Sequence, residues 1–340
     1  MIAHGRVVLV TGLDVGADAA EPQQINGTAQ DGRNQCFGIG LLGRDAQHCA
    51  ADVYSRITTQ IVAAIEAGAG DWRMPWHHDG AATTRPQNVT SRKRYRGVNV
   101  LALWIAAEAS AYSSGLWGTY RQWASLGAQV CKGEHGTTVV FWKQAASRAE
   151  DDRDDAEAGP GRMFARAFTV FNLAQVEGYE PEPVAQLPES ERFGHADAFV
   201  EALKIPITEG AYDAHYRIDL DRIFMPGFAS FRDASAHMGT LLHEAAHATG
   251  AKHRLDRNFA ERFKRDSLAI EEICAELTAS FVLADLGIAH HPRPDHAAYV
   301  ASWLRALKDD PRAIFTAASK AQAAADWMHA QQPQSEEIAA

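Results

Sequence analysis

Two histidines four residues apart, His243 and His247, constrain this chain more than any other feature. Residues four apart lie on one face of an α-helix, one turn above the other, so both imidazoles can bind one metal ion. Glu244 follows the first histidine and would reach the open side of that ion, where it can take a proton from water. In a chain with 15 histidines, chance produces this pattern on the order of 0.05 times. The pattern predicts a metal-binding helix, with a surface helix carrying two solvated histidines as the alternative.

The residues around the motif predict where this helix begins and ends. Ser235 is expected to be the N-cap, and Asp233 adds favourable negative charge near that end. Gly250 is expected to stop the helix. The apolar residues at helical spacing, which would form the buried stripe, are Met238, Leu241, Leu242 and Ala245.

A second predicted helix, residues 267–287, carries the candidates for a third metal ligand. A catalytic zinc site needs three protein ligands and keeps its fourth position for water. Glu272 and Glu276 share a helix face, so we expect Glu272 to bind the metal and Glu276 to hold a ligand imidazole. This order resembles zinc peptidases in which a second acid follows the ligand glutamate by four residues. The reverse assignment stays open, as does Glu271 as the ligand; Zn²⁺ is the expected ion, with another divalent transition metal as the alternative.

The composition limits the kinds of protein this chain can be. Its 340 residues allow two domains of ordinary size, and a hydrophobic fraction of 46% is enough to form cores. The net charge of −10 excludes a protein that is basic all over, but not a local basic patch. The four cysteines form no C-x-x-C pair and are expected to be free thiols of a reducing cytoplasm. No apolar run approaches 18 residues, so no membrane span is expected.

Residues 52–143 differ from the rest of the chain in charge and in aromatic content. Ten Arg and Lys face six Asp and Glu there, a balance of +4. Bases of single-stranded nucleic acid stack on aromatic rings while Arg and Lys neutralise phosphates. Tryptophans in a core and arginines that keep a loop soluble are the alternative, and Trp104 and Trp142 are assigned to the core because they lie in apolar runs. The residues predicted to contact DNA are Trp72, Trp76, Asn88, Arg94, Tyr95, Arg96, Asn99, Trp117, Tyr120, Arg121 and Lys132.

Several separate motifs, in one order, resemble the ArdC-type antirestriction proteins from about residue 52 to residue 287. The motifs that resemble the N-terminal domain of that family are Trp72-x-x-x-Trp76, Pro86-x-Asn88, Tyr95-Arg-Gly-Val-Asn-Val-Leu101, Trp117-x-Thr-Tyr-Arg-Gln-Trp123 and Gly127-Ala-x-Val-x-Lys-Gly-Glu134. Those that resemble its metallopeptidase domain are Phe171-Asn-x-x-Gln-x-Glu-Gly178, Asp221-x-Ile-x-Met-Pro226, the histidine motif and Glu271-Glu-x-x-Ala-Glu276. The resemblance implies a plasmid- or mobile-element-borne protein that binds single-stranded DNA and protects incoming DNA from host restriction during conjugation.

The expected fold class is α+β, with a small α/β single-stranded-DNA-binding domain followed by a zincin-like metallopeptidase domain. The expected order is a flexible extension over residues 1–51, the DNA-binding domain over 52–148, an acidic linker over 149–162, the metallopeptidase domain over 163–330 and a disordered tail over 331–340. Residues 130–143 are expected to form a β-hairpin, and residues 212–226 a strand, a turn and a strand. Thr119 and Gln122 have capping-box spacing ahead of a short helix.

The expected function is a cytoplasmic antirestriction protein that binds single-stranded DNA and carries a zinc metallopeptidase site with Glu244 as general base. The strand at residues 223–225 is expected to pair with an extended protein or peptide substrate. The carbonyl-polarising group is left open between His253, Tyr216 and His237. Two alternatives remain: an active DNA-recruited protease acting on a host protein, and an accessory to plasmid DNA replication or transfer.

Overall fold

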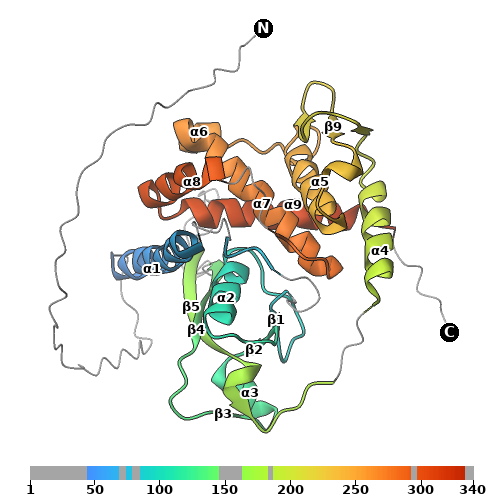
Figure 1. Ribbon diagram of the computed structural model, residues 1–340. Coiled ribbons are helices and arrows are strands. Elements are labelled where there is room, and N and C mark those ends of the chain that lie inside the picture. Colours follow the sequence, from blue (N-terminus) through green and yellow to red (C-terminus); the bar gives the residue numbers. More distant parts are fainter. Residues whose placement is uncertain are drawn as a thin grey trace, which may run out of the picture. The chain divides into compact units, whose positions relative to one another are not determined.

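The computed structural model describes residues 44–68, 74–78, 85–144, 163–182, 187–291 and 297–333. Figure 1 shows its helices and strands, coloured along the sequence. The expected extension before residue 44, Trp72, the acidic linker at 149–162 and the tail from residue 334 lie outside the described residues. Helix α1 (Arg44–Gly68) begins before residue 52, where the first periodic structure was expected. The fold combines helices with short sheets, as the α+β prediction requires.

A four-stranded sheet organises the first half of the described chain. Its spatial order is β1-β2-β5-β4, with β1 parallel to β2 and the other neighbours antiparallel. The strands are β1 (Gln87–Asn88), β2 (Leu116–Gly118), β4 (Thr137–Gln144) and β5 (Met163–Asn172). Strand β4 precedes the predicted linker and β5 follows it, and the two strands pair along their length.

The hairpin expected at residues 130–143 does not form. The strand β3 (Gln129–Val130) pairs with β6 (Val176–Glu177), while β4 pairs along its whole length with β5. The side-chain amide of Gln175 donates hydrogen bonds to Glu134 at 2.7 Å and to the His135 carbonyl at 2.9 Å. The segment between β3 and β4 is therefore held by a residue far along the chain, which a local turn pattern does not reveal.

Three helices accompany the first sheet. The helix α2 (Val98–Ala109) contacts β4, and α1 contacts both α2 and β5, with Ile57, Ile61 and Ile65 of α1 fully buried. The short helix α3 (Tyr120–Ser125) begins with the predicted capping box, in which Gln122 and Thr119 satisfy each other's backbone N–H groups.

The second half of the described chain is mainly helical. The helix α7 (Ser267–Leu286) packs against α5 (Ala234–Thr249) and α9 (Ala313–Ala330) (Figure 1). The remaining helices are α4 (Glu189–Ala202), α6 (Ala260–Phe263) and α8 (Ala297–Asp309), with 3-10 turns at Leu173–Gln175, Phe228–Ser230 and Lys264–Asp266. Within the described residues, no helix is both long and apolar enough to cross a membrane.

A three-stranded sheet stands next to α5, and its order corrects one expectation. Strand β9 (Arg222–Met225) lies between β7 (Ile207–Glu209) and β8 (His215–Arg217), parallel to the first and antiparallel to the second. The predicted strand–turn–strand is therefore present as β8 and β9. However, both sides of β9 are occupied, so the strand at residues 223–225 cannot pair with a substrate as expected.

The ends of α5 and α7 show which capping predictions hold. Asp233, not Ser235, is the N-cap of α5, and its carboxylate accepts a hydrogen bond of 2.7 Å from the Ala236 N–H. Gly250 is the C-cap of α5, as expected. Gly287 ends α7 with φ of 68°, a left-handed conformation that costs glycine little.

Candidate metal centre and nucleic-acid surface

Packing of α7 across α5 brings the three expected metal ligands together. The Nε2 atoms of His243 and His247 are 3.1 Å apart. The Glu272 carboxylate faces both, with one oxygen 3.5 Å from Nε2 of His243 and the other 3.7 Å from Nε2 of His247. Zinc–ligand bonds of about 2.0–2.1 Å place tetrahedral ligand atoms about 3.3 Å apart. The spacing of these atoms therefore fits one small divalent cation.

A second set of carboxylates faces the outer nitrogens of both imidazoles. Nδ1 of His243 lies 2.7 Å from Glu276, and Nδ1 of His247 lies 3.0 Å from Glu271. A carboxylate at this distance favours a proton on Nδ1, which leaves the lone pair on Nε2. Two such lone pairs then face each other and the Glu272 carboxylate. This set of electron donors is what a bound cation requires.

The charges around the site keep the Glu272 and Glu271 carboxylates ionised. Burial raises the pKa of Glu272, but the His243 and His247 imidazoles bring this pKa below its ordinary value. Burial acts in the same direction on Glu271, yet hydrogen bonds from Arg257 and His247 lower its pKa to about 2. Arg257 is buried, and its Nε donates to Glu271 at 2.8 Å. Arg257 lies in an irregular segment, where no periodicity in the sequence marks it as a partner of Glu271.

The candidate centre opens into a cleft of about 600 Å³. Glu244 lines this cleft beside His243 and His247, as a general base must. Of the three proposed carbonyl-polarising residues, Tyr216 on β8 also lines it, and its hydroxyl donates to Asp221 at 2.7 Å. His253 is exposed and pairs with Asp221 at 3.1 Å.

The third of these candidates, His237, packs between aromatic rings. Its ring centroid lies 5.2 Å from that of Phe228 and 5.0 Å from that of Phe231. Burial lowers the pKa of His237, which favours its neutral form. The cleft geometry therefore favours Tyr216 over both histidines.

Four of the predicted DNA contacts are buried and present no face to a base. Trp76 packs against Trp303 with ring centroids 5.7 Å apart, and Trp117 and Tyr95 lie in the same core. Asn99 exchanges two hydrogen bonds of 2.7 Å with the backbone of Val140. All four side chains are buried, and for the two tryptophans this is the core position that was kept as the alternative.

The other predicted DNA contacts within the described residues are reached by solvent to different degrees. Arg94 and Arg96 are exposed but already paired, with Asp285 at 2.7 Å and with Asp326. Tyr120 is 51% exposed. Arg121, the next residue of α3, and Lys132, which follows β3, are also exposed. The half-buried Asn88 donates to Gln122 at 3.1 Å, which ties the turn after β1 to α3.

Among the tryptophans assigned to the core, the two positions differ. Trp104 is buried and contacts Phe281 of α7, with ring centroids 6.0 Å apart. Trp142 of β4 is 43% exposed, although its ring still contacts Tyr54. Its apolar run did not reveal that the Phe141 and Trp142 side chains of β4 are exposed. The two cysteines whose side chains are described, Cys131 and Cys274, are free thiols, as expected.

Two family models match this chain in succession. The first, the N-terminal domain of anti-restriction factor ArdC, matches residues 51–171. The second, a zincin-like metallopeptidase, matches residues 194–320 and so contains α5, α7 and the candidate metal centre. The chain therefore has an α+β fold with two family domains in this order.

Relatives match over most of the chain. The protein y4eC of Sinorhizobium fredii is 56% identical over 284 residues, which is 83% of this chain and 92% of that protein. The DNA primase TraC of Escherichia coli is 35% identical over 81% of this chain, but the match spans only 27% of the primase.

Two solved structures of the antirestriction protein ArdC from plasmid R388 are similar to this fold. The metal-free structure has a TM-score of 0.67 at 39% identity and covers 83% of this chain and 98% of that one. The Mn(II)-bound structure has a TM-score of 0.67 at 38% identity, with coverages of 84% and 100%. A divalent metal is thus bound by a close structural relative.

Proposed function

The chain belongs to the ArdC family of antirestriction proteins, and from this premise we propose that its first domain binds single-stranded DNA and its second is a zinc-dependent peptidase. The proposed outcome is protection of incoming DNA from host restriction. The observation that carries the peptidase half is the convergence of two imidazole nitrogens and the Glu272 carboxylate at the floor of a cleft that Glu244 also lines.

The proposed metal ligands are His243, His247 and Glu272, with Glu276 and Glu271 orienting the two imidazoles. Two imidazoles, one carboxylate and an open fourth position suit Zn²⁺, whose Lewis acidity would activate water and polarise a peptide carbonyl. Glu244 would accept the proton of the attacking water and pass it to the leaving amine. The Mn(II)-bound relative makes Mn²⁺ the alternative ion.

The peptide would lie along β8. This strand is an edge of its sheet, and its residues His215 and Tyr216 line the cleft. An extended peptide paired with β8 gains backbone hydrogen bonds and brings one carbonyl toward the cleft floor. Burial and Asp221 raise the pKa of Tyr216, so its hydroxyl stays protonated. To donate to that carbonyl, the hydroxyl would turn away from Asp221, to which it donates in this structure.

The substitution Glu244→Gln separates metal binding from hydrolysis. Metal content should stay at the wild-type level because Glu244 is outside the ligand set, whereas cleavage of a fluorogenic peptide library should fall by about 100-fold or more. His243→Ala should lose both. Wild-type protein with bound metal that cleaves no more peptide than Glu244→Gln would contradict the peptidase proposal.

The proposed DNA-binding surface comprises the exposed side chains near α3. Tyr120 offers an aromatic face for a base, while Lys93, Arg121 and Lys132 are exposed cations for phosphates. Each base stacked on an aromatic ring contributes about 1–3 kcal/mol by alanine substitution. Arg94 and Arg96 are secondary members of this surface because each already pairs with a carboxylate.

Anisotropy titrations of labelled single- and double-stranded DNA over a salt series test this surface. Single strands should bind more tightly, and the affinity should fall steeply with salt. Tyr120→Ala should weaken binding by about 1–3 kcal/mol, and Lys132→Ala should reduce the salt slope by about 0.7. Lys252→Ala, at an exposed position of the second domain, is the matched control. Equal affinity for both DNA forms would remove the DNA-binding proposal.

A second candidate function, support of plasmid DNA replication or transfer, is favoured by the likeness to a DNA primase. Conjugation into restriction-proficient and restriction-deficient recipients separates the two candidates. An antirestriction protein raises transfer only into proficient recipients, whereas a replication accessory raises transfer into both. Glu244→Gln in the same assay would then show whether protection requires hydrolysis or only DNA binding.

A further inference from the structure

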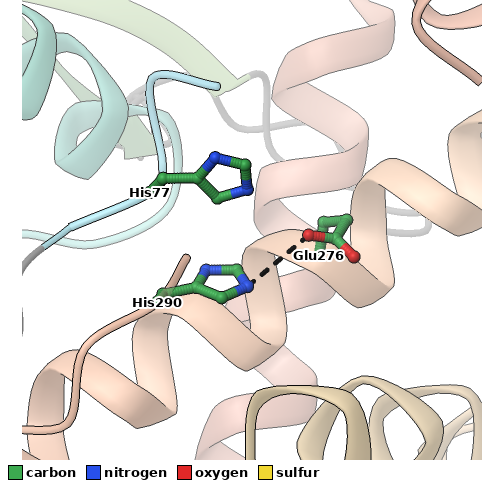
Figure 2. A group of neighbouring side chains, drawn as sticks. All are labelled: His77, Glu276 and His290. Carbon is green, nitrogen blue, oxygen red and sulfur yellow. Dashed lines mark ion pairs between the residues drawn. The ribbon is translucent and has the colours of Figure 1, made fainter. Parts of the chain in front are cut away.

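We propose that His290 and His77 are positioning residues of the metal centre, acting through Glu276, and that they connect it to residues 74–78 of the first domain. Figure 2 shows the three side chains converging, with Glu276 facing His290. Their nearest nitrogen and oxygen atoms all lie within 4.8 Å of one another, and all three residues are buried. This inference rests on the metal ligands proposed above.

Glu276 has a different imidazole on each of its oxygens. One oxygen lies 2.7 Å from Nδ1 of His243, and the other lies 3.6 Å from Nε2 of His290. Glu276 has no solvent exposure, and a buried carboxylate is costly unless polar groups compensate its charge. His290 therefore helps to hold the carboxylate in the orientation that positions the His243 ring.

His290 is in turn fixed by residues 74–78. His78 and His290 exchange two backbone hydrogen bonds, of 3.0 and 2.8 Å. The His77 ring meets the His290 ring edge to face, with centroids 5.0 Å apart and an interplanar angle of 88°. The position of His290 thus depends on a segment that precedes it by more than 200 residues.

The same three residues also resemble a second metal site, but the His77 ring argues against it. Nδ1 of His77 accepts a hydrogen bond of 2.9 Å from the Met74 N–H. The lone pair on Nδ1 is therefore in use, and the proton of the neutral ring is on Nε2, which then cannot bind a metal. The geometry favours a positioning role for these residues over a second ion.

One face of α7 carries this connection along its length. Glu272, Glu276 and Ser280 are four residues apart, so they follow one another along that face. Ser280 donates its hydroxyl hydrogen to the carbonyl of Trp76, and its own carbonyl contacts Nε2 of His78 at 3.1 Å. The metal ligand and the contacts to the first domain are therefore on the same side of a single helix.

Co²⁺ titration followed by absorption tests the proposal, because it reports both affinity and ligand geometry in the full chain. His290→Ala should weaken Co²⁺ binding by about 10-fold or more and alter the absorption spectrum. His290→Gln, which keeps a polar N–H group able to face Glu276, should recover most of that loss. His77→Ala should give a smaller loss of about threefold, because His77 acts one contact further from the metal.

His329→Ala is the matched control, because His329 also pairs with a carboxylate of α7, Asp285, at 3.0 Å. It should keep the wild-type affinity and spectrum. Unfolding curves recorded in EDTA identify variants that lose general stability. If His290→Ala proves unstable, His290→Gln is compared with His329→Ala in its place. A His290→Ala variant that folds and matches His329→Ala in affinity and spectrum would overturn the proposal.

The stoichiometry separates the remaining outcomes. Two Co²⁺ ions per wild-type chain, with one lost in His290→Ala, would assign a second metal site and overturn the positioning role. Binding that survives His243→Ala would reject the proposed metal centre, and this inference with it. Binding that is lost in His243→Ala but unchanged in both His290 variants would reject only the positioning role.

Discussion

At the scale of single residues, the structure distinguishes polar side chains that hold the fold from those that face solvent. Asn99 and Asn88 are both amides in the basic, aromatic region of the sequence. The Asn99 amide satisfies both backbone groups of Val140 and joins α2 to β4. Asn88 is half-buried and organises the turn that follows it, accepting from the Ser91 N–H at 3.0 Å. Neither role is visible in the residue type.

Replacing Asn99 with alanine should lower the free energy of unfolding by about 2–3 kcal/mol, because two buried backbone groups lose their partners. Urea unfolding measures this loss. The affinity of the folded variant for single-stranded DNA should not change, since the side chain is buried. Ser125→Ala, at an exposed hydroxyl of α3, should change stability by less than about 0.5 kcal/mol. A DNA-binding defect in stably folded Asn99→Ala would restore Asn99 to the DNA-binding surface.

At the scale of elements, α7 joins the candidate metal centre to the first half of the chain. Its N-terminal part carries Glu271 and Glu272, and its C-terminal part carries Asp285, whose side chain is buried. Asp285 pairs with Arg85 at 2.8 Å and with Arg94 at 2.7 Å. One helix therefore carries the proposed metal ligand Glu272 near one end and holds a distant loop at the other.

The Asp285 pairs predict a dependence of stability on pH. Burial raises the pKa of Asp285, but His329, Arg85 and Arg94 bring it below the ordinary value of 3.8. A carboxylate whose pKa is lower in the folded state stabilises the protein above its unfolded pKa, and that stability is lost as the pH falls through the folded pKa. Asp285→Asn should therefore lower the free energy of unfolding by about 3 kcal/mol near pH 6. Its difference in stability from wild type should shrink below about pH 4.

Urea unfolding between pH 3 and pH 6, with EDTA present, measures the Asp285 effect. Asp309→Asn is the matched control, because its pair with Arg265 is exposed and should contribute about 0–1 kcal/mol. A difference between Asp285→Asn and wild type that is constant over this pH range would show that Asp285 acts through shape rather than charge.

At the scale of the whole molecule, residues from both family domains share one hydrophobic core. A single cluster of buried residues includes Leu101 and Trp104 of the first domain and Phe281 and Ala318 of the second. The helix α1 contacts α8, and α2 contacts α9. Domains that share a core in this way are expected to unfold together.

Leu101→Ala tests this unity, because Leu101 is fully buried in the shared core. The free energy of unfolding should fall by about 3 kcal/mol. The unfolding midpoints measured by circular dichroism and by tryptophan fluorescence should shift equally. Leu126→Ala, at an exposed position, should leave both midpoints nearly unchanged. Two separate transitions, of which only one responds to Leu101→Ala, would show that the domains unfold independently.

The sequence by itself determined the features that depend on short spacings. Residues four apart share a helix face, so the grouping of His243 with His247 and of Glu272 with Glu276 followed from local periodicity. The capping box at Thr119 and the helix ends at Gly250 and Gly287 followed from the same kind of local rule.

Only the tertiary structure decided the features that depend on partners far apart in the chain. It paired β4 with β5, enclosed β9 between two strands and buried Trp76 against Trp303. It also placed Arg257 against Glu271 and His290 against Glu276. Whether a side chain is buried depends on all the elements packed around it, and local spacing in the sequence does not predict those neighbours.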